Sequence, residues 1–238
     1  MKNLTTYLVL LTLLFSFRTF AGDEIHFIGF NTFDQENMAQ SNKTFDNYIT
    51  QLMPIMARHG MTYEMYNVKH GGSEALNADV ITFGSIKNMQ TFQTFFQDPA
   101  LHAIMPMLEQ ALSQHQVVFT RDAMEKHHDA SAHTLLSLQW LEGQPQQTSA
   151  TLSAMTKNIS ERFSHYGVKK ALASQGLMSN KGLGKDNQQT QPPHQVELWS
   201  INDAHGFFDD PKVVEFDRKI KQYIQRSENF WLKQRLIN

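Results

Sequence analysis

Cysteine is absent from all 238 residues of the chain. Its absence excludes disulfide bonds, thiolate metal sites, thiol catalysis and a cysteine-linked lipid anchor. An excess of basic charge is also missing, because 21 Lys and Arg residues stand against 23 Asp and Glu residues. Such a chain offers no basic surface for nucleic acid, so we expect no DNA or RNA partner. Hydrophobic residues make up 41% and charged residues 18%, which indicates a folded globular protein rather than a disordered one.

Long apolar runs are missing except near the N-terminus. Lys2 precedes an apolar stretch at residues 7–17, and Arg18 ends it. This stretch is shorter than the ~20 residues of a membrane span. It is followed by Thr19, Phe20 and Ala21, a small-x-small pattern that predicts residues 1–21 to be a signal peptide cleaved after Ala21. We therefore expect a periplasmic or secreted protein with no span after cleavage; an uncleaved anchor is the alternative.

A short motif occurs twice in the chain, as FFQDP at residues 95–99 and as FFDDP at residues 207–211. The apolar positions after each motif recur at the same offset. They are Leu101, Ile104, Leu108 and Leu112 in the first copy and Val213, Phe216, Ile220 and Ile224 in the second. Their spacing of three, four and four residues predicts one amphipathic helix in each copy.

A second helix pattern also occurs twice. It consists of Phe45, Tyr48, Leu52 and Met56 in the first copy and of Leu152, Met155, Ile159 and Phe163 in the second. Gly60 and Gly167 follow these patterns, and each is expected in the left-handed conformation that ends a helix. Residues 179–194 contain the net insertion of the second copy and are rich in Gly, Asn, Gln and Pro. We predict a loop there.

Strand patterns fill the intervals between these helices. They lie at residues 25–33, 61–68, 79–83 and 117–121 in the first copy and at residues 134–141, 168–177, 195–199 and 230–237 in the second. Each copy therefore has the β-α-β-β-α-β order of a ferredoxin-like unit. We expect an α+β protein with one unit at residues 22–121, a linker at 122–131 and a second unit at 132–238. The two sheets are expected to pack face to face as an intramolecular α/β barrel.

Two such units, with an aromatic-x-Asp-Pro start to the second helix, resemble the dimeric α/β-barrel superfamily, which includes antibiotic-biosynthesis-monooxygenase-like proteins. The resemblance implies a barrel that often holds a small organic ligand. It does not define an activity, because the members include monooxygenases, isomerases and haem-handling enzymes. The haem-handling members carry a Trp and a His on the second helix, whereas this chain has Phe95 or Phe207, and His102 at a different spacing. We expect no cofactor.

The candidate ligand-binding residues are those predicted to face the barrel lumen. Monooxygenase-like relatives carry an Asn on the first strand that helps to bind substrate or oxygen; Asn31 matches it, and Gln139 stands at the equivalent position of the second copy. Tyr66, His70 and Glu197 are further candidates, and a His facing a Glu can perform general acid–base work. The alternatives are that both amides bind backbone groups and that the other three side chains lie on the surface.

A metal site has little support in the sequence. His127, His128, Asp129 and His133 are close together in or next to the predicted linker, but their spacing does not match that of an ordered site. We therefore interpret them as part of a solvated hinge.

Three functions are compatible with these observations, and whether the protein is an enzyme stays open. The first is an exported α/β-barrel protein that binds an unknown small molecule. The second is a cofactor-independent monooxygenase, isomerase or lyase that acts on a small organic substrate in the lumen. The third is a non-catalytic interaction protein with a closed core. A chain that contains both halves has less need to dimerise, so a monomer is expected.

Overall fold

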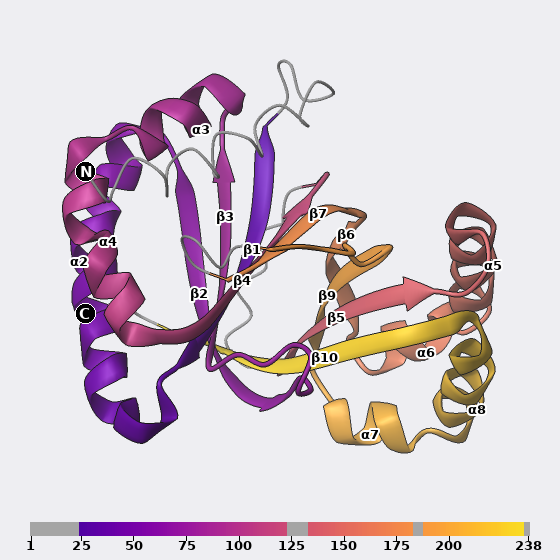
Figure 1. Ribbon diagram of the computed structural model, residues 1–238. Helices are drawn as coiled ribbons and strands as arrows, with labels where there is room; N and C mark the ends of the chain where they lie inside the picture. The colour runs from indigo at the N-terminus through magenta and orange to yellow at the C-terminus, as the bar shows by residue number, and fades with distance from the viewer. Residues whose placement is uncertain (1–23, 123–132, 183–187, 236–238) are drawn as a thin grey trace.

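A computed structural model describes residues 24–122, 133–182 and 188–235 (Figure 1). The predicted signal peptide, nearly all of the predicted linker and part of the insertion in the second copy lie outside these residues. Among the helices that the structure describes, none has both the length and the apolar character needed to cross a membrane.

One antiparallel sheet organises the protein. Within the described residues it contains ten strands in the order β6-β9-β5-β10-β2-β3-β1-β4-β7-β8. The strands are β1 (Ile25–Phe33), β2 (Thr62–Gly71), β3 (Val80–Ile86), β4 (Leu112–Thr120), β5 (His133–Leu141), β6 (Lys169–Ser174), β7 (Gly176–Lys181), β8 (Gln188–Thr190), β9 (Gln195–Ile201) and β10 (Ile224–Gln234).

The sheet has two similar halves. The first half has the order β2-β3-β1-β4 and the second has β10-β5-β9-β6, so each first strand lies between the third and fourth strands of its own half. β10 pairs with β2 and joins the halves edge to edge. The result is an α+β protein with a single large sheet, whose free edges are β6 and β8. The sheet is therefore open, and the closed barrel expected from the sequence is not formed by its strand pairing.

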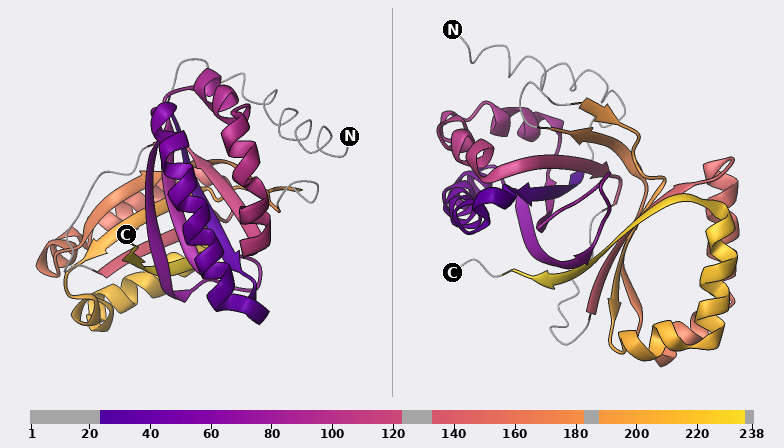
Figure 2. Two further views of the ribbon diagram at one scale, coloured as in Figure 1. Left: turned by 90° about the vertical axis from the view of Figure 1, so that its left-hand side faces the viewer. Right: turned by 60° about the horizontal axis from the view of Figure 1, so that its bottom comes forward.

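Helices cover the outer face of each half (Figure 2). The first half carries η1 (Gln35–Asn37), α2 (Met38–Arg58), α3 (Met89–Phe96) and α4 (Pro99–Ala111). The second half carries α5 (Pro145–Lys157), α6 (Ser160–His165), α7 (Ala204–Asp209), α8 (Pro211–Ile220) and η3 (Lys221–Tyr223). The helix predicted to continue through Ile159 is thus divided into α5 and α6.

The glycine and Asp-Pro signals are confirmed. Gly60 and Gly167 have φ values of 63° and 61°, the left-handed conformation expected after a helix. The Asp98 carboxylate accepts a hydrogen bond from the Ala100 amide at 2.9 Å, and Asp210 accepts one from the Lys212 amide at 2.8 Å. In both motifs the aspartate caps the helix, and the proline that follows occupies its first turn.

The inner faces of the two halves share one buried apolar cluster. Its members include Ile28, Phe30, Phe83, Leu136, Leu138, Val196, Leu198 and Phe230. The rings of Phe30 and Phe230, from β1 and β10, lie 5.5 Å apart between centroids. Side chains of the protein itself therefore occupy the region where the sequence predicted a ligand-binding lumen.

The predicted orientation of the first strands is wrong. Asn31 was expected to face the lumen, but Phe33, on the same face of β1, packs in the core beneath the helices, whereas Ile28 and Phe30 lie in the inner cluster. The alternation of side chains defines two faces without saying which is covered by helices. In β1 every residue except Phe27 is buried, so hydrophobicity does not distinguish the faces.

The insertion is also different from its prediction. Part of residues 179–194 forms strand rather than loop: β7 pairs with β4, and β8 pairs with β7. The edge of β4 offers backbone donors and acceptors, and β7 pairs with them while its Met178 packs into the core beside Phe119. The added hairpin extends the first half next to its helices.

Candidate functional site

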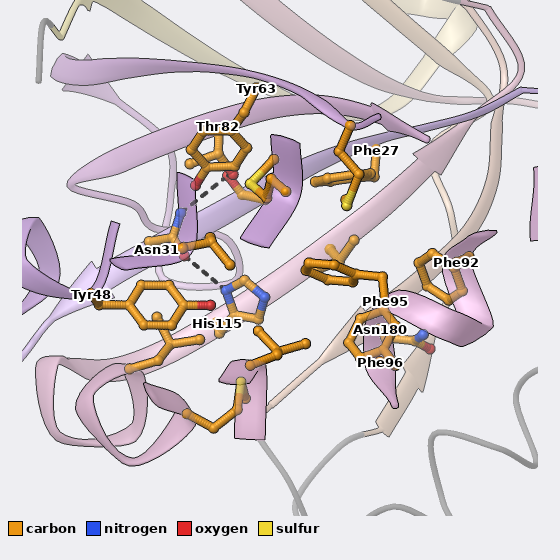
Figure 3. A pocket seen from close by; sticks show the side chains of 18 of the residues that line it. Phe27, Asn31, Tyr48, Tyr63, Thr82, Phe92, Phe95, Phe96, His115 and Asn180 are labelled. Carbon is orange, nitrogen blue, oxygen red and sulfur yellow. Dashed lines mark hydrogen bonds between the residues drawn. The ribbon is translucent and has the colours of Figure 1, made fainter. Parts of the chain in front are cut away.

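An apolar cavity lies in the first half between the sheet and α2, α3 and α4 (Figure 3). Its volume is about 220 Å³. Most of its walls are aromatic or aliphatic, including Phe27, Phe45, Leu52, Phe92, Phe95, Phe96, Met105, Leu108 and Val117. The lining residues that the structure describes include no Asp, Glu, Lys or Arg. We refer to it as the first cavity.

His115 and Asn31 supply the central polar pair of the first cavity. The Asn31 amide nitrogen donates to the Val80 carbonyl at 3.2 Å, so the other end of this side chain, Oδ1, is an acceptor. His115 Nδ1 lies 2.9 Å from that oxygen. Nδ1 must therefore carry the ring proton, and Nε2 is left as an acceptor.

Burial keeps this imidazole neutral. It lowers the pKa of His115 from 6.5 to about 4, because the charged form loses its hydration inside the protein. Gly29, on the neighbouring strand, lies beside the ring and close to Thr82. A Cβ atom at Gly29 would lie 2.4 Å from Thr82 Oγ1 and 3.6 Å from His115 Cε1. A side chain at this position would therefore require Thr82 to shift, whereas its distance from the ring is an ordinary van der Waals contact.

Other polar groups of the first cavity are also uncharged. Burial raises the pKa of Tyr48 and of Tyr63 well above the usual value of 10, so both hydroxyls keep their protons at neutral pH. Asn180, on β7, also lines the cavity. Its Oδ1 is buried and has no hydrogen-bond partner among the residues that the structure describes.

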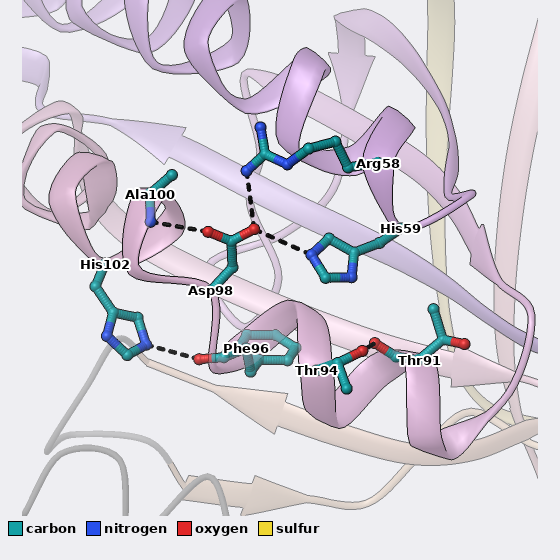
Figure 4. Close-up of polar contacts among 8 residues, drawn as sticks. All are labelled: Arg58, His59, Thr91, Thr94, Phe96, Asp98, Ala100 and His102. Atoms are coloured by element: carbon teal, nitrogen blue, oxygen red, sulfur yellow. Dashed lines mark hydrogen bonds and ion pairs between the residues drawn. The ribbon is translucent and has the colours of Figure 1, made fainter.

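The corner between α3 and α4 is attached to the end of α2 (Figure 4). Asp98 Oδ2 accepts hydrogen bonds from Arg58 Nη2 at 2.9 Å and from His59 Nε2 at 3.1 Å. These bonds hold the pKa of Asp98 well below its usual value. The His59 ring also contacts the edge of Phe95, with centroids 5.6 Å apart. The contacts of Asp98 thus position an aromatic wall of the first cavity.

A second cavity of about 630 Å³ lies in the other half, between the sheet and α5 and α8. Its polar lining includes Gln139, Gln195 and the pair formed by Lys170 Nζ and Glu197 Oε1 at 2.6 Å. Lys170 also lies 4.3 Å from the centroid of the Trp199 ring. Haem iron is held by His, Cys, Met or Tyr. None of these is among the described residues that line the second cavity, so those residues do not fit a haem group.

The structure separates the candidate residues that the sequence placed in one lumen. Asn31 lines the first cavity, whereas Gln139 and Glu197 line the second. Tyr66 belongs to the inner cluster, and its hydroxyl donates to Glu64 at 3.1 Å. His70 is exposed on β2 and its ring lies 5.7 Å from that of Trp231. A shared site is therefore not formed, and a ligand-binding role for each of the five stays a prediction.

The candidate metal ligands of the linker are largely outside the described residues. His133 is described, and its ring meets the edge of Trp231 at 6.1 Å. Within residues 24–122, 133–182 and 188–235, no group of three or more His, Asp or Glu side chains is arranged to hold a metal ion.

His115, Tyr48 and Asn180 were missed as site residues. The predicted fourth strand began at Val117, so His115 lay outside it; β4 in fact begins at Leu112. Tyr48 was assigned only to the apolar stripe of its helix. Asn180 was assigned to the insertion loop. A longer fourth strand, with alternation extended to His115, would have placed this histidine on the same face as Val117.

Comparison with known proteins supports the fold. No family model and no curated protein matches the chain. Two chlorite dismutase variants from Candidatus Nitrospira defluvii align with TM-scores of 0.56. They have 9% and 10% identity, cover 91% of this chain, and are themselves covered over 93% and 92% of their length. An anthrone oxidase-like protein has 10% identity and a TM-score of 0.49, with coverage of 88% of this chain and 90% of that chain. At these identities the similarity concerns the ferredoxin-like α+β fold alone.

Proposed function

We propose that the protein binds a small, largely apolar organic molecule in the first cavity. The observation that carries this proposal is the neutral His115–Asn31 pair inside a cavity whose other walls are mainly aromatic and aliphatic. Ligand sites commonly combine such walls with a few polar groups that orient the ligand. This proposal moves the predicted site from the lumen to the space beneath the helices.

The cavity volume limits the size of the ligand. An apolar cavity of about 150 Å³ in another protein holds one benzene molecule. The first cavity has about 220 Å³ and therefore suits one substituted ring or two fused rings. We expect naphthalene-sized molecules to enter it and larger ring systems to require movement of α3 or α4.

We favour binding over catalysis because of the chemistry of His115. With a pKa lowered to about 4, its imidazole is a weak base at neutral pH. Within the described part of the lining there is also no carboxylate or cation that would stabilise a developing charge. A cofactor-independent monooxygenase, isomerase or lyase stays the alternative, and turnover of a bound molecule would establish it.

Equilibrium dialysis with naphthalene tests the proposal. The folded protein should retain about one equivalent at saturation. Val117→Phe should abolish retention, because the added ring would occupy the first cavity; Val214→Phe, on the exposed surface of α8, is the matched control and should not. Equal retention by both variants, or none by the unmodified protein, would contradict the proposal.

We also propose that the protein is exported and monomeric, and that its halves descend from one ferredoxin-like unit. The signal-like residues 1–21 support export. The repeated Asp-Pro helix caps and the matching strand orders support duplication. Intact-mass analysis of an extracytoplasmic fraction should show a chain that begins at Gly22. Analytical ultracentrifugation should give the mass of one chain. An obligate dimer would contradict the proposal that the protein is a monomer.

A further inference from the structure

We infer that the first cavity selects uncharged molecules that carry a hydrogen-bond donor, and that this donor binds Nε2 of His115. The inference rests on the proposed function and adds the chemical class of the ligand. It follows from the state of the imidazole, from the groups around it and from the charges that the cavity lacks.

The imidazole presents one unused acceptor. Nδ1–H is bound to Asn31 Oδ1 at 2.9 Å, and the Asn31 amide is in turn bound to the Val80 carbonyl. The ring is thus held in one tautomer. Among the described residues only Nδ1 of this ring has a hydrogen-bond partner, so Nε2 remains available as an acceptor. A ligand O–H or N–H would satisfy it.

Two other polar groups of the first cavity, on Tyr48 and Asn180, also favour a ligand that carries a hydroxyl group. In Figure 3 the Tyr48 hydroxyl points toward the part of the cavity that contains the His115 ring. Within the described part of the chain, no hydrogen bond satisfies this hydroxyl, and Asn180 Oδ1 is likewise unpaired. A hydroxyl group on a ligand can donate to an imidazole and accept from a tyrosine at once. The cavity therefore fits an alcohol or a phenol better than a pure hydrocarbon.

Charged molecules are excluded by the same walls. An ion that enters an apolar cavity loses its hydration and requires an opposite charge. Among the described residues of the lining there is none, since the neutral imidazole is the only acidic or basic side chain in that set. Carboxylates and ammonium ions of the same size as a neutral ligand should therefore bind much more weakly.

A set of four probes of similar size tests the inference: 2-naphthol, 2-methylnaphthalene, 2-naphthoate and naphthalene. The dissociation constant of 2-naphthol should be at least tenfold lower than that of 2-methylnaphthalene, because the two differ by a hydroxyl in place of a methyl group. The carboxylate should not bind measurably. Equal binding of 2-naphthol and 2-methylnaphthalene would overturn the inference and leave the proposed function intact. Failure of all four to bind would overturn the proposed function itself.

A variant and a spectroscopic measurement assign the effect to His115. His115→Phe should bind 2-methylnaphthalene and lose the preference for 2-naphthol. His205→Phe, at a side chain that is 91% exposed, is the matched control and should keep it. Should His115→Phe not fold, nitrogen-15 spectra of the unmodified protein give the answer. The His115 Nε2 resonance should move upfield with 2-naphthol and stay in place with 2-methylnaphthalene; an unmoved resonance with bound 2-naphthol would overturn the inference.

Discussion

Asn31 and His115 are direct partners in the register of β1 and β4, and their side chains meet on the face that the helices cover. Cross-strand neighbours on one face of a sheet lie close enough for their side chains to interact. Here the contact is a hydrogen bond of 2.9 Å between Asn31 Oδ1 and His115 Nδ1. One pair of strands therefore determines both the position and the tautomer of the imidazole.

Asn31→Asp should raise the pKa of His115 above its value of about 4. The substitution replaces a neutral acceptor with a carboxylate of nearly the same shape, and a nearby negative charge favours the imidazolium. A proton NMR titration of the His115 ring measures the change. Gln139→Glu introduces a carboxylate in the second cavity and should leave the His115 titration unchanged. An unchanged titration in Asn31→Asp would show that this pair does not govern the imidazole.

His115 should make the protein less stable as the pH falls below about 6.5. The unfolded chain binds a proton at this histidine near its ordinary pKa of 6.5, whereas the folded protein binds it only near 4. Between these values the unfolded state carries more protons, so the free energy of unfolding decreases as the pH decreases. The difference corresponds to about 3 kcal/mol below both values and about 2 kcal/mol at pH 5.

Urea unfolding of the unmodified protein and of His115→Phe at pH 7.5 and pH 5 measures this contribution. The loss of stability between the two pH values should be about 2 kcal/mol smaller in the variant. His205→Phe should behave like the unmodified protein, because the side chain of His205 is exposed. The same pH dependence in all three proteins would mean that His115 takes up its proton equally in both states.

Asp98→Asn should loosen the α3–α4 corner and weaken ligand binding in the first cavity. The amide keeps the shape of the carboxylate but loses its charge-assisted bonds with Arg58 and His59. The Phe95 ring, which contacts His59, would then be held less firmly. We expect a lower midpoint temperature of unfolding and a higher dissociation constant for naphthalene. Asp209→Asn, at an exposed carboxylate, is the control and should change neither.

The effect of Asp98 should also depend on pH. Because the folded state holds the pKa of Asp98 below its usual value, its stabilisation is present above that usual value and is lost as the pH falls below it. The stability difference between the unmodified protein and Asp98→Asn should therefore shrink in acid. A difference that grows in acid would contradict this account of the corner.

Periodicity predicted the elements of this fold well, and repeated signals predicted the helix ends. β1 has the predicted bounds, and Gly60, Gly167 and the two Asp-Pro motifs lie where helices end or begin. These signals are local, because each depends on backbone conformation within a few residues. The strand order of each half also follows from the β-α-β-β-α-β pattern.

The candidate site was less predictable because it depends on which face of β1 the helices cover. Both faces of this strand are buried, so the sequence placed Asn31 in the lumen, whereas it lines the cavity beneath the helices. Gln139 occupies the matching position of the second half and therefore lies under a different set of helices. The pairing of Asn31 with His115 depends on register between strands about 80 residues apart, which local patterns do not contain.

Glu228 of the second half contacts the first half through Ser73. This residue of β10 is only 4% exposed, and its carboxylate accepts hydrogen bonds from Ser73 at 2.6 Å and from Arg226 Nε at 3.0 Å. Ser73 follows β2 of the first half, and the neighbouring Gly72 amide donates to the Asn229 carbonyl at 2.9 Å. Glu228→Ala would leave these donors without their acceptor. We expect it to lower the free energy of unfolding by about 2–4 kcal/mol.

Urea unfolding of three variants tests whether Glu228 stabilises the contact between the two halves or acts only as a surface charge. Glu215→Ala removes an exposed helical carboxylate paired with Lys219 and should have no measurable effect. The double variant Glu228→Leu with Arg226→Met should lose less stability than Glu228→Ala, because replacing both partners with apolar groups leaves no unpaired Arg226. If Glu228→Ala were as stable as Glu215→Ala, the buried carboxylate would not hold β10 to the end of β2, and the backbone ladder between these strands would have to join the halves alone.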